Sequence, residues 1–135
     1  IMVNRTSGQP FEFEILLVSP DFERVIQGFV KNLKRLGINA KIRIVDTSQY
    51  TRRIDTFDFD MIMALYPQSI SPGNEQREFW SSSRADIQGS KNYVGLKNPI
   101  IDEIIEKLIT ATSRVDLINY CRVLDRLLLW GYTMI

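Results

Sequence analysis

The side chains best suited to catalysis are missing or isolated in this 135-residue sequence. It contains no histidine, the side chain used most often as a general base and as a metal ligand. Its serines therefore have no imidazole to activate them, and those in the middle of the chain lack a lysine at the Ser-x-x-Lys spacing. No glycine motif for phosphate or dinucleotide binding is present. The sequence predicts a protein that is not an enzyme and that needs no cofactor.

Two other candidate groups have simpler interpretations. Asp58 and Asp60 would project to the same side of a strand and could hold a hard cation. No further ligands accompany them, so we interpret them as the polar entry to a buried strand and predict no metal site. Cys121, the only cysteine, falls on the apolar stripe of a helix. It is typical of a small core residue and not of a nucleophile.

Charge also excludes some partners. The formal net charge is +1, so overall electrostatics favours neither nucleic acid nor an acidic membrane. The basic residues that cluster in the first half lack interleaved aromatic residues and are interpreted as a solvated helix face and strand edge. These residues are Lys31, Lys34, Arg35, Lys41 and Arg43.

One polar stretch, "YPQSISPGNEQREFW" at 66–80, is typical of a binding loop. Donors and acceptors lie there between aromatic side chains at the two ends of the stretch. Its polar residues could instead serve the loop itself, with Asn74 capping the next helical turn and Arg77 pairing with Glu75 or Asp86. Both interpretations remain open from the residues alone. The polar candidates are Gln68, Ser69, Ser71, Asn74, Gln76 and Arg77.

The elements before this stretch predict an α/β fold. Apolar periodicity indicates strands, a long helix ending at Gly37 and a short helix over Thr47–Asp55, with Asp46 and Gln49 at capping-box spacing. This strand–helix order favours right-handed crossovers and a mainly parallel βαβαβ sheet with flanking helices. Ligands bind at the carboxyl ends of such strands, and Tyr66 ends the last one. The expected strands are Phe11–Val18, Ile38–Val45 and a central Phe59–Tyr66.

The second half predicts mainly helices. One or two helical turns are expected near 73–82, and "YVG" at 93–95 is expected to add a short strand. Asn98 with Pro99 and Ser113 with Asp116 are typical helix starts, so 98–130 is predicted to form an antiparallel helical pair. We expect 1–135 to be a single α/β domain. No apolar run is long enough to span a bilayer.

The pattern of several segments resembles the family 5 extracellular solute-binding proteins of ABC transporters, and within them the YejA-type branch of peptide-binding proteins. The general pattern is a helix ending at "LG", a strand, "DTSQYTRR" and "FD" before a strand. The block "SPGNEQREFW" is more specific to the branch. The resemblance runs from Phe11 to Trp130.

The resemblance implies that the chain is most of the C-terminal lobe of a two-lobed receptor with a type II periplasmic-binding-protein fold. Its partners would be a peptide or peptide-like ligand, a missing N-terminal lobe and a membrane permease, with no nucleic acid. The location would be periplasmic or extracytoplasmic. By position, the resemblance implicates Tyr66, Gln68, Ser69 and Ile70 in the ligand cleft. Ser71, Asn74 and Arg77 belong to the branch motif, and we add them as candidate ligand contacts.

One departure from the family bears on the ligand. Some relatives place an aspartate in this loop to pair with the free α-amino group of a peptide. Here "YPQSIS" holds no acid before Glu75. The sequence therefore favours a blocked amino terminus, or binding through the ligand's main chain and side-chain pockets.

The remaining expectations concern the ends of the chain and the competing classes. The chain stops within an apolar run after Trp130, so we expect a piece of a longer protein, with any signal peptide outside it. An enzyme or a regulatory domain of the same parallel α/β architecture is the alternative. The regulatory alternative requires an acidic cluster at the carboxyl ends of the first and third strands, where only Asp21 is available.

Overall fold

The computed structural model describes residues 2–135. The chain divides into two compact units, one ending at Leu65 and one formed by Tyr66–Ile135, and each is described by itself. Within the described residues, none of the helices has the length and apolar character needed to cross a membrane.

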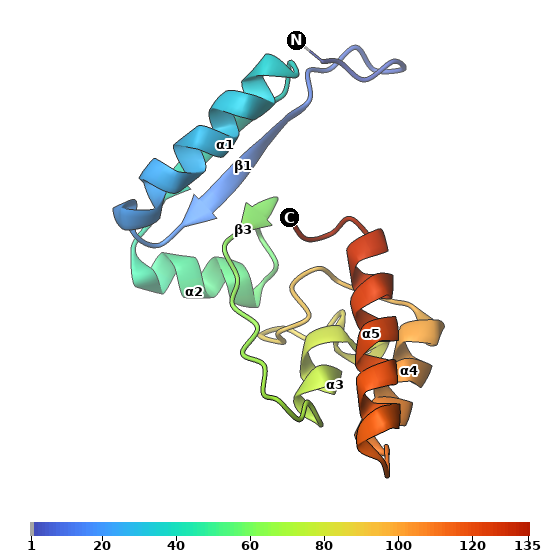
Figure 1. Ribbon diagram of the computed structural model, residues 1–135. Coiled ribbons are helices and arrows are strands. Elements are labelled where there is room, and N and C mark those ends of the chain that lie inside the picture. The colour runs from blue at the N-terminus through green and yellow to red at the C-terminus, as the bar shows by residue number, and fades with distance from the viewer. Residues whose placement is uncertain (1) are drawn as a thin grey trace. The chain divides into compact units, whose positions relative to one another are not determined.

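The first unit is a three-stranded parallel sheet with two helices. Strand β1 lies between β2 and β3, and Ile15 is opposite both Ile42 and Met61. Helix α1 connects β1 to β2, and α2 connects β2 to β3, so the predicted parallel order is confirmed (Figure 1). The bounds are β1 Glu12–Leu17, α1 Glu23–Arg35, β2 Asn39–Ile44, α2 Thr47–Asp55 and β3 Met61–Ile62, with a 3₁₀ turn at Pro20–Phe22.

Local sequence signals set the helix ends of this unit. Asp46 accepts a hydrogen bond from the backbone N–H of Gln49 at 2.9 Å, which confirms the predicted cap of α2. Gly37 has a φ of +82°, the left-handed conformation that glycine adopts without strain. Just beyond it, the Ile38 N–H bonds back to the Leu33 carbonyl at 3.0 Å. These contacts end α1 and start β2.

The core of the first unit lies between β1, β2 and α1. Ile15, Leu17 and Ala40 are buried, and the apolar stripe of α1 packs against them. On the polar edge, the Arg53 side chain donates to a Glu14 carboxylate oxygen at 2.8 Å and pairs with Asp58. The stripe residues are Ile26, Phe29, Val30 and Leu33.

The prediction of a long central third strand is wrong. Strand β3 covers only Met61–Ile62, and β1 occupies the middle of the described sheet. The reason lies in the neighbouring strand. β1 ends at Leu17, and the chain turns at Ser19 and Pro20 into the 3₁₀ turn. A strand needs a hydrogen-bonded neighbour. Because β1 ends, the residues that follow Ile62 have no strand beside them in the described chain and leave the sheet.

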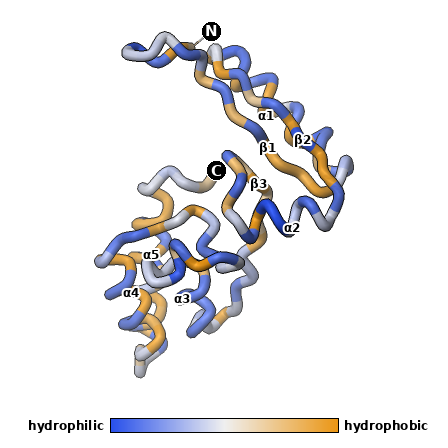
Figure 2. The backbone as a smooth tube through the Cα atoms, turned by 180° about the vertical axis from the view of Figure 1, so that it is seen from behind, coloured by the Kyte–Doolittle hydropathy of each residue, from blue (hydrophilic) through white to orange (hydrophobic). Residues whose placement is uncertain are grey.

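The second unit is helical. Its elements are α3 Glu75–Trp80, a 3₁₀ turn Ser82–Arg84, α4 Pro99–Ile109 and α5 Arg114–Trp130. Asn98 and Ser113 cap α4 and α5 through their side chains, as predicted. Figure 2 shows apolar positions recurring along both helices among hydrophilic ones. The core buries Phe79, Trp80, Ile101, Ile105, Leu108 and Leu124.

The predicted strand at 93–95 is wrong, because a buried side chain organises that segment as a loop. Asn92 has no solvent exposure. Its Nδ2 donates to the carbonyls of Ser81 and Leu96, both at 3.0 Å, and its Oδ1 accepts the Leu96 N–H at 2.9 Å. The main chain around it is therefore satisfied by a side chain and not by a neighbouring strand.

Candidate functional site

All of the predicted site residues lie in the second unit, in irregular chain from Tyr66 to Asn74 and in the first turn of α3. Tyr66 does not end a strand, because β3 ends at Ile62. Pro67 and Pro72 lack an N–H, which disfavours a continued ladder through this stretch. The site is therefore a loop that leads into α3.

Tyr66 anchors the loop to the core. Its ring lies 4.4 Å from the Trp80 ring and 5.3 Å from the Phe79 ring, centroid to centroid, and Tyr93 completes the cluster. Burial, with a smaller contribution from Tyr93, raises the pKa of Tyr66 to about 12. The phenol thus stays neutral across physiological pH and acts as a packed aromatic.

Gln68 is held by Gln76, a buried residue of α3. The Gln76 Nε2 donates to Gln68 Oε1 at 2.7 Å, and the Gln76 Oε1 accepts from Trp80 Nε1 at 3.2 Å. The i, i+4 spacing places Gln76 and Trp80 on one helix face. The polar pattern included Gln76, but nothing in the sequence indicated that it supports Gln68.

Ser69, Ile70 and Ser71 form the turn at the tip of the loop. The Ser71 N–H donates to Ser69 Oγ at 3.2 Å. Arg114, at the start of α5, donates from Nη1 to the Ile70 carbonyl at 2.9 Å and to Ser71 Oγ at 3.4 Å. The Ile70 side chain is 85% exposed. Sequence reasoning missed Arg114, since no local pattern links it to a loop 44 residues away.

Arg77 and Asn74 hydrogen-bond to other residues of the protein and hold the start of α3 in place. Both ends of the Arg77 guanidinium donate to the Glu106 carboxylate, at 2.7 and 2.5 Å, and its Nη1 donates to Asn74 Oδ1 at 2.7 Å. The expected pairing with Glu75 or Asp86 is wrong. Glu75 instead accepts the Gly73 N–H at 2.8 Å, and Asp86 pairs with Lys97. The side chain of Asn74 makes no cap bond to α3.

The pKa values follow these contacts. The hydrogen bond from Arg77 lowers the pKa of Glu106, and the backbone N–H of Gly73 lowers the pKa of Glu75. Both carboxylates are therefore stabilised in their charged form in the folded protein.

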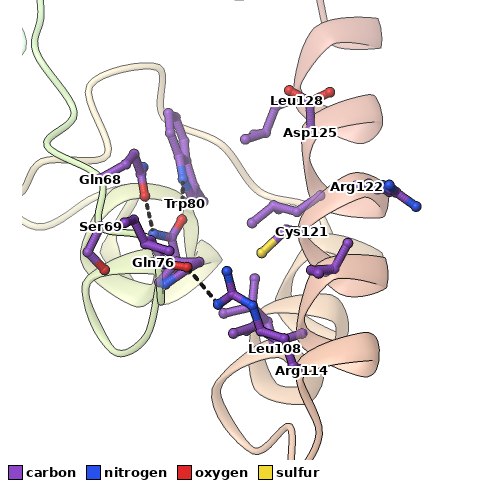
Figure 3. A pocket seen from close by; sticks show the side chains of 15 residues that line it. Gln68, Ser69, Gln76, Trp80, Leu108, Arg114, Cys121, Arg122, Asp125 and Leu128 are labelled. Atoms are coloured by element: carbon purple, nitrogen blue, oxygen red, sulfur yellow. Dashed lines mark hydrogen bonds between the residues drawn. The ribbon is translucent and has the colours of Figure 1, made fainter.

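A cavity of about 460 Å³ lies between the loop and α5 (Figure 3). Gln68, Ser69, Gln76 and Trp80 lie on one side of it, and α5 forms the other side. Cys121 lines the α5 wall, and burial raises the pKa of its thiol, which suits packing more than nucleophilic attack. The apolar lining consists of Ile70, Pro72, Trp80, Leu108, Leu117, Ile118, Cys121, Leu124 and Leu128.

Several backbone N–H groups of the loop have no backbone partner in the part of the chain that is described. Among residues 2–135, no backbone-to-backbone hydrogen bond engages an N–H group of residues 66–70. All but Tyr66 of these residues are exposed. Unpaired backbone groups at a surface are the features that extended peptides recognise.

Other candidate groups have structural partners. Asp58 pairs with Arg53, and Asp60 accepts the Glu14 N–H at 2.8 Å. Within the part of the chain that the structure describes, no group of three or more His, Cys, Asp or Glu residues could hold a metal ion.

The fold is similar to that of solved periplasmic binding proteins. The structure of the periplasmic binding protein DppA from Helicobacter pylori, solved with the peptide STSA, superposes with a TM-score of 0.74 at 16% identity and covers 89% of this chain and 24% of that one. The oligopeptide-binding protein AppA from Bacillus subtilis, solved with a nonapeptide, gives a TM-score of 0.73 at 22% identity over 90% and 24% of the two chains. The α/β prediction with a type II periplasmic-binding-protein fold is confirmed.

Sequence comparison identifies relatives that are much more similar to this chain than the solved structures are. The chain is 50% identical over 128 residues to the uncharacterized protein y4wM of Sinorhizobium fredii, covering 95% of this chain and 19% of that protein. It is 49% identical over 128 residues to the probable peptide-binding protein YejA of Agrobacterium fabrum, covering 95% and 21%. No protein-family model matches the chain. The predicted resemblance to YejA-type proteins is confirmed, and the chain spans about a fifth of the length of these relatives.

Proposed function

We propose that this chain is one lobe of a longer, extracytoplasmic peptide receptor that delivers its ligand to an ABC permease. The lobe holds an extended peptide or peptide-like compound against residues 66–71. A second lobe elsewhere in the protein closes over the ligand by a hinge. No catalytic step is required.

The backbone N–H groups of Tyr66, Gln68, Ser69 and Ile70, which engage no backbone carbonyl of residues 2–135, carry this proposal. A peptide strand laid along the loop gains main-chain hydrogen bonds that do not depend on the peptide's sequence. Tyr66 fixes one end of the segment in the aromatic cluster, and Arg114 fixes the other end at the Ile70 carbonyl. A loop held at both ends loses little conformational freedom on binding, which favours affinity.

The comparisons support the ligand class. The Agrobacterium fabrum relative is named a probable peptide-binding protein, and both fold neighbours above were solved with peptides bound. The loop lacks an acid before Glu75, so main-chain contacts take the place of an ion pair with a free amino terminus.

The proposed roles of the candidate residues differ. Gln68, Ser69, Ile70 and Ser71 contact the ligand directly. Tyr66 supports them from the core. The remaining candidates, Asn74 and Arg77, hold α3 in position through Glu106.

N-methylated peptides test the proposal. Calorimetry on the full-length protein should show binding of an acetylated peptide. Two peptides are compared, one methylated at the odd-numbered amide nitrogens and one at the even-numbered ones. Only one of them should lose binding, because alternate amides of a strand face opposite sides and only one set faces the loop. Equal tolerance of methylation at every amide would contradict main-chain recognition.

The isolated chain provides a second test. It supplies one wall of a shared cleft, and the entropic cost of immobilising the ligand remains when the other wall is lost. We expect a loss of roughly 5 kcal/mol or more, which takes a micromolar ligand beyond the millimolar range. Tight peptide binding by the isolated 135-residue chain would contradict a cleft shared between lobes.

A further inference from the structure

The cavity beside the loop has the size and lining of a binding pocket. Its volume of about 460 Å³ falls within the roughly 300–1,000 Å³ typical of small-molecule sites. Its floor includes the core residues Leu108 and Leu124, and its wall on α5 is mostly apolar. Such a space favours an apolar group over a charged one, because burying an unpaired charge is costly.

The polar lining lies around this apolar floor. Arg114, Arg122 and Asp125 are the charged residues that line the cavity. Arg114 uses its Nη1 to hold the Ile70 carbonyl and Ser71 Oγ, which keeps the loop wall in place. On the same wall, Gln76 holds Gln68 by a 2.7 Å hydrogen bond (Figure 3). These contacts hold the loop side of the cavity in place.

We propose that this cavity is a specificity pocket that accepts one aromatic or branched aliphatic side chain of the bound peptide. The inference rests on the proposed function and deepens it. Gln68, Ser69 and Ile70 line the cavity, and their backbone N–H groups have no backbone partner within the described residues. Alternate side chains of an extended peptide project to the same face. A peptide paired with this segment therefore directs a side chain toward the cavity.

Filling the pocket tests the assignment. The probes are acetylated alanine tetrapeptides in which Gly, Ala, Leu, Phe or Asp replaces each position in turn. In the full-length protein, one position should favour Leu or Phe over Gly by roughly 10- to 100-fold, the value of burying such a side chain. Cys121→Phe places a ring inside the cavity and should reduce that preference to less than threefold.

Two further variants provide an alternative way to fill the cavity and a control. Ile118→Phe adds the same ring to a lining residue that is already 38% exposed, so it avoids overpacking if Cys121→Phe does not fold. Val123→Phe is the matched control, because Val123 is exposed on α5 and does not line the cavity. The control should keep the full preference.

The outcomes separate this inference from the proposed function. If both filled variants bind peptides with the wild-type preference, the pocket assignment is wrong and peptide binding stands. If wild type binds the peptides without any side-chain preference, the assignment is again wrong. If wild type binds none of them, the proposed function and the pocket fail together. Slower maleimide labelling of Cys121 with the Phe peptide than with the Gly peptide would support the pocket directly.

Discussion

Replacing Asn92 with alanine should destabilise the second unit more than any surface change. The side chain is completely buried and satisfies three main-chain groups, the carbonyls of Ser81 and Leu96 and the N–H of Leu96. Each buried group left without a partner costs about 1–3 kcal/mol. Partial access of water lowers the sum, so we expect a loss of about 3–5 kcal/mol in the free energy of unfolding.

The assay is thermal and urea unfolding of the chain, followed by circular dichroism. A loss of that size should lower Tm by roughly 10–20 °C for a domain of this length. Asn119→Ala is the matched control, because Asn119 is exposed on α5 and should change stability by less than about 0.5 kcal/mol. A Tm for Asn92→Ala within 3 °C of wild type would refute the role of this network.

Asn92→Asp sharpens the same test through pH. The new carboxylate would face two carbonyl oxygens in a buried site, so its pKa in the folded state should lie above its unfolded value of about 3.9. A group with a raised folded pKa stabilises below the unfolded pKa and loses that contribution as pH rises through the folded pKa. Asn92→Asp should therefore approach wild-type stability near pH 4 and fall away toward pH 7.

Three further predictions concern Arg77, the acid dependence of stability and the exposed apolar end of the chain. Arg77→Ala should lower Tm but leave peptide affinity in the full-length protein within threefold, because the guanidinium is engaged by Glu106; a large affinity loss by calorimetry would place it in the site. Glu75 and Glu106 have lowered folded pKa values, so their stabilisation is present above the unfolded pKa of about 4.3 and is lost as pH falls. Glu75→Gln should flatten the fall in stability between pH 5 and pH 3, and an unchanged slope in acid titrations would contradict this. The exposed side chains of Trp130 and Ile135 should make the isolated chain self-associate; a monomer by light scattering at high concentration would count against it.

The parts of the fold that were predictable depend on signals a few residues apart. The cap of α2 at Asp46, the Gly37 stop after α1 and the Asn98–Pro99 start of α4 each involve neighbours in sequence. The apolar periodicity of a helix and the capping of its ends both involve residues within about one helical turn of each other. The sequence of that short segment is therefore enough to predict them.

The errors depend on distant partners. The length of β3 is set by where β1 ends, and the conformation of 93–95 is set by Asn92 reaching across to Ser81. Arg77 and Glu106 are 29 residues apart, and Arg114 reaches a loop 44 residues away. The sequence shows that such residues can form hydrogen bonds, but it does not show which distant residue will be the partner.

This difference between local and distant contacts bears on the peptide recognition that we propose for the loop. Its polar composition was the signal that identified it, yet Gln68, Ser69 and Asn74 accept hydrogen bonds from the protein itself. Polar side chains engaged in this way fix the shape of the loop and have less capacity left for a ligand. We infer that the main chain of 66–70 provides affinity for many peptides and that discrimination between them falls to the adjacent apolar cavity. A receptor built in this way would tolerate Ser69→Ala with a small loss of affinity. It would lose its side-chain preference only when the cavity is filled.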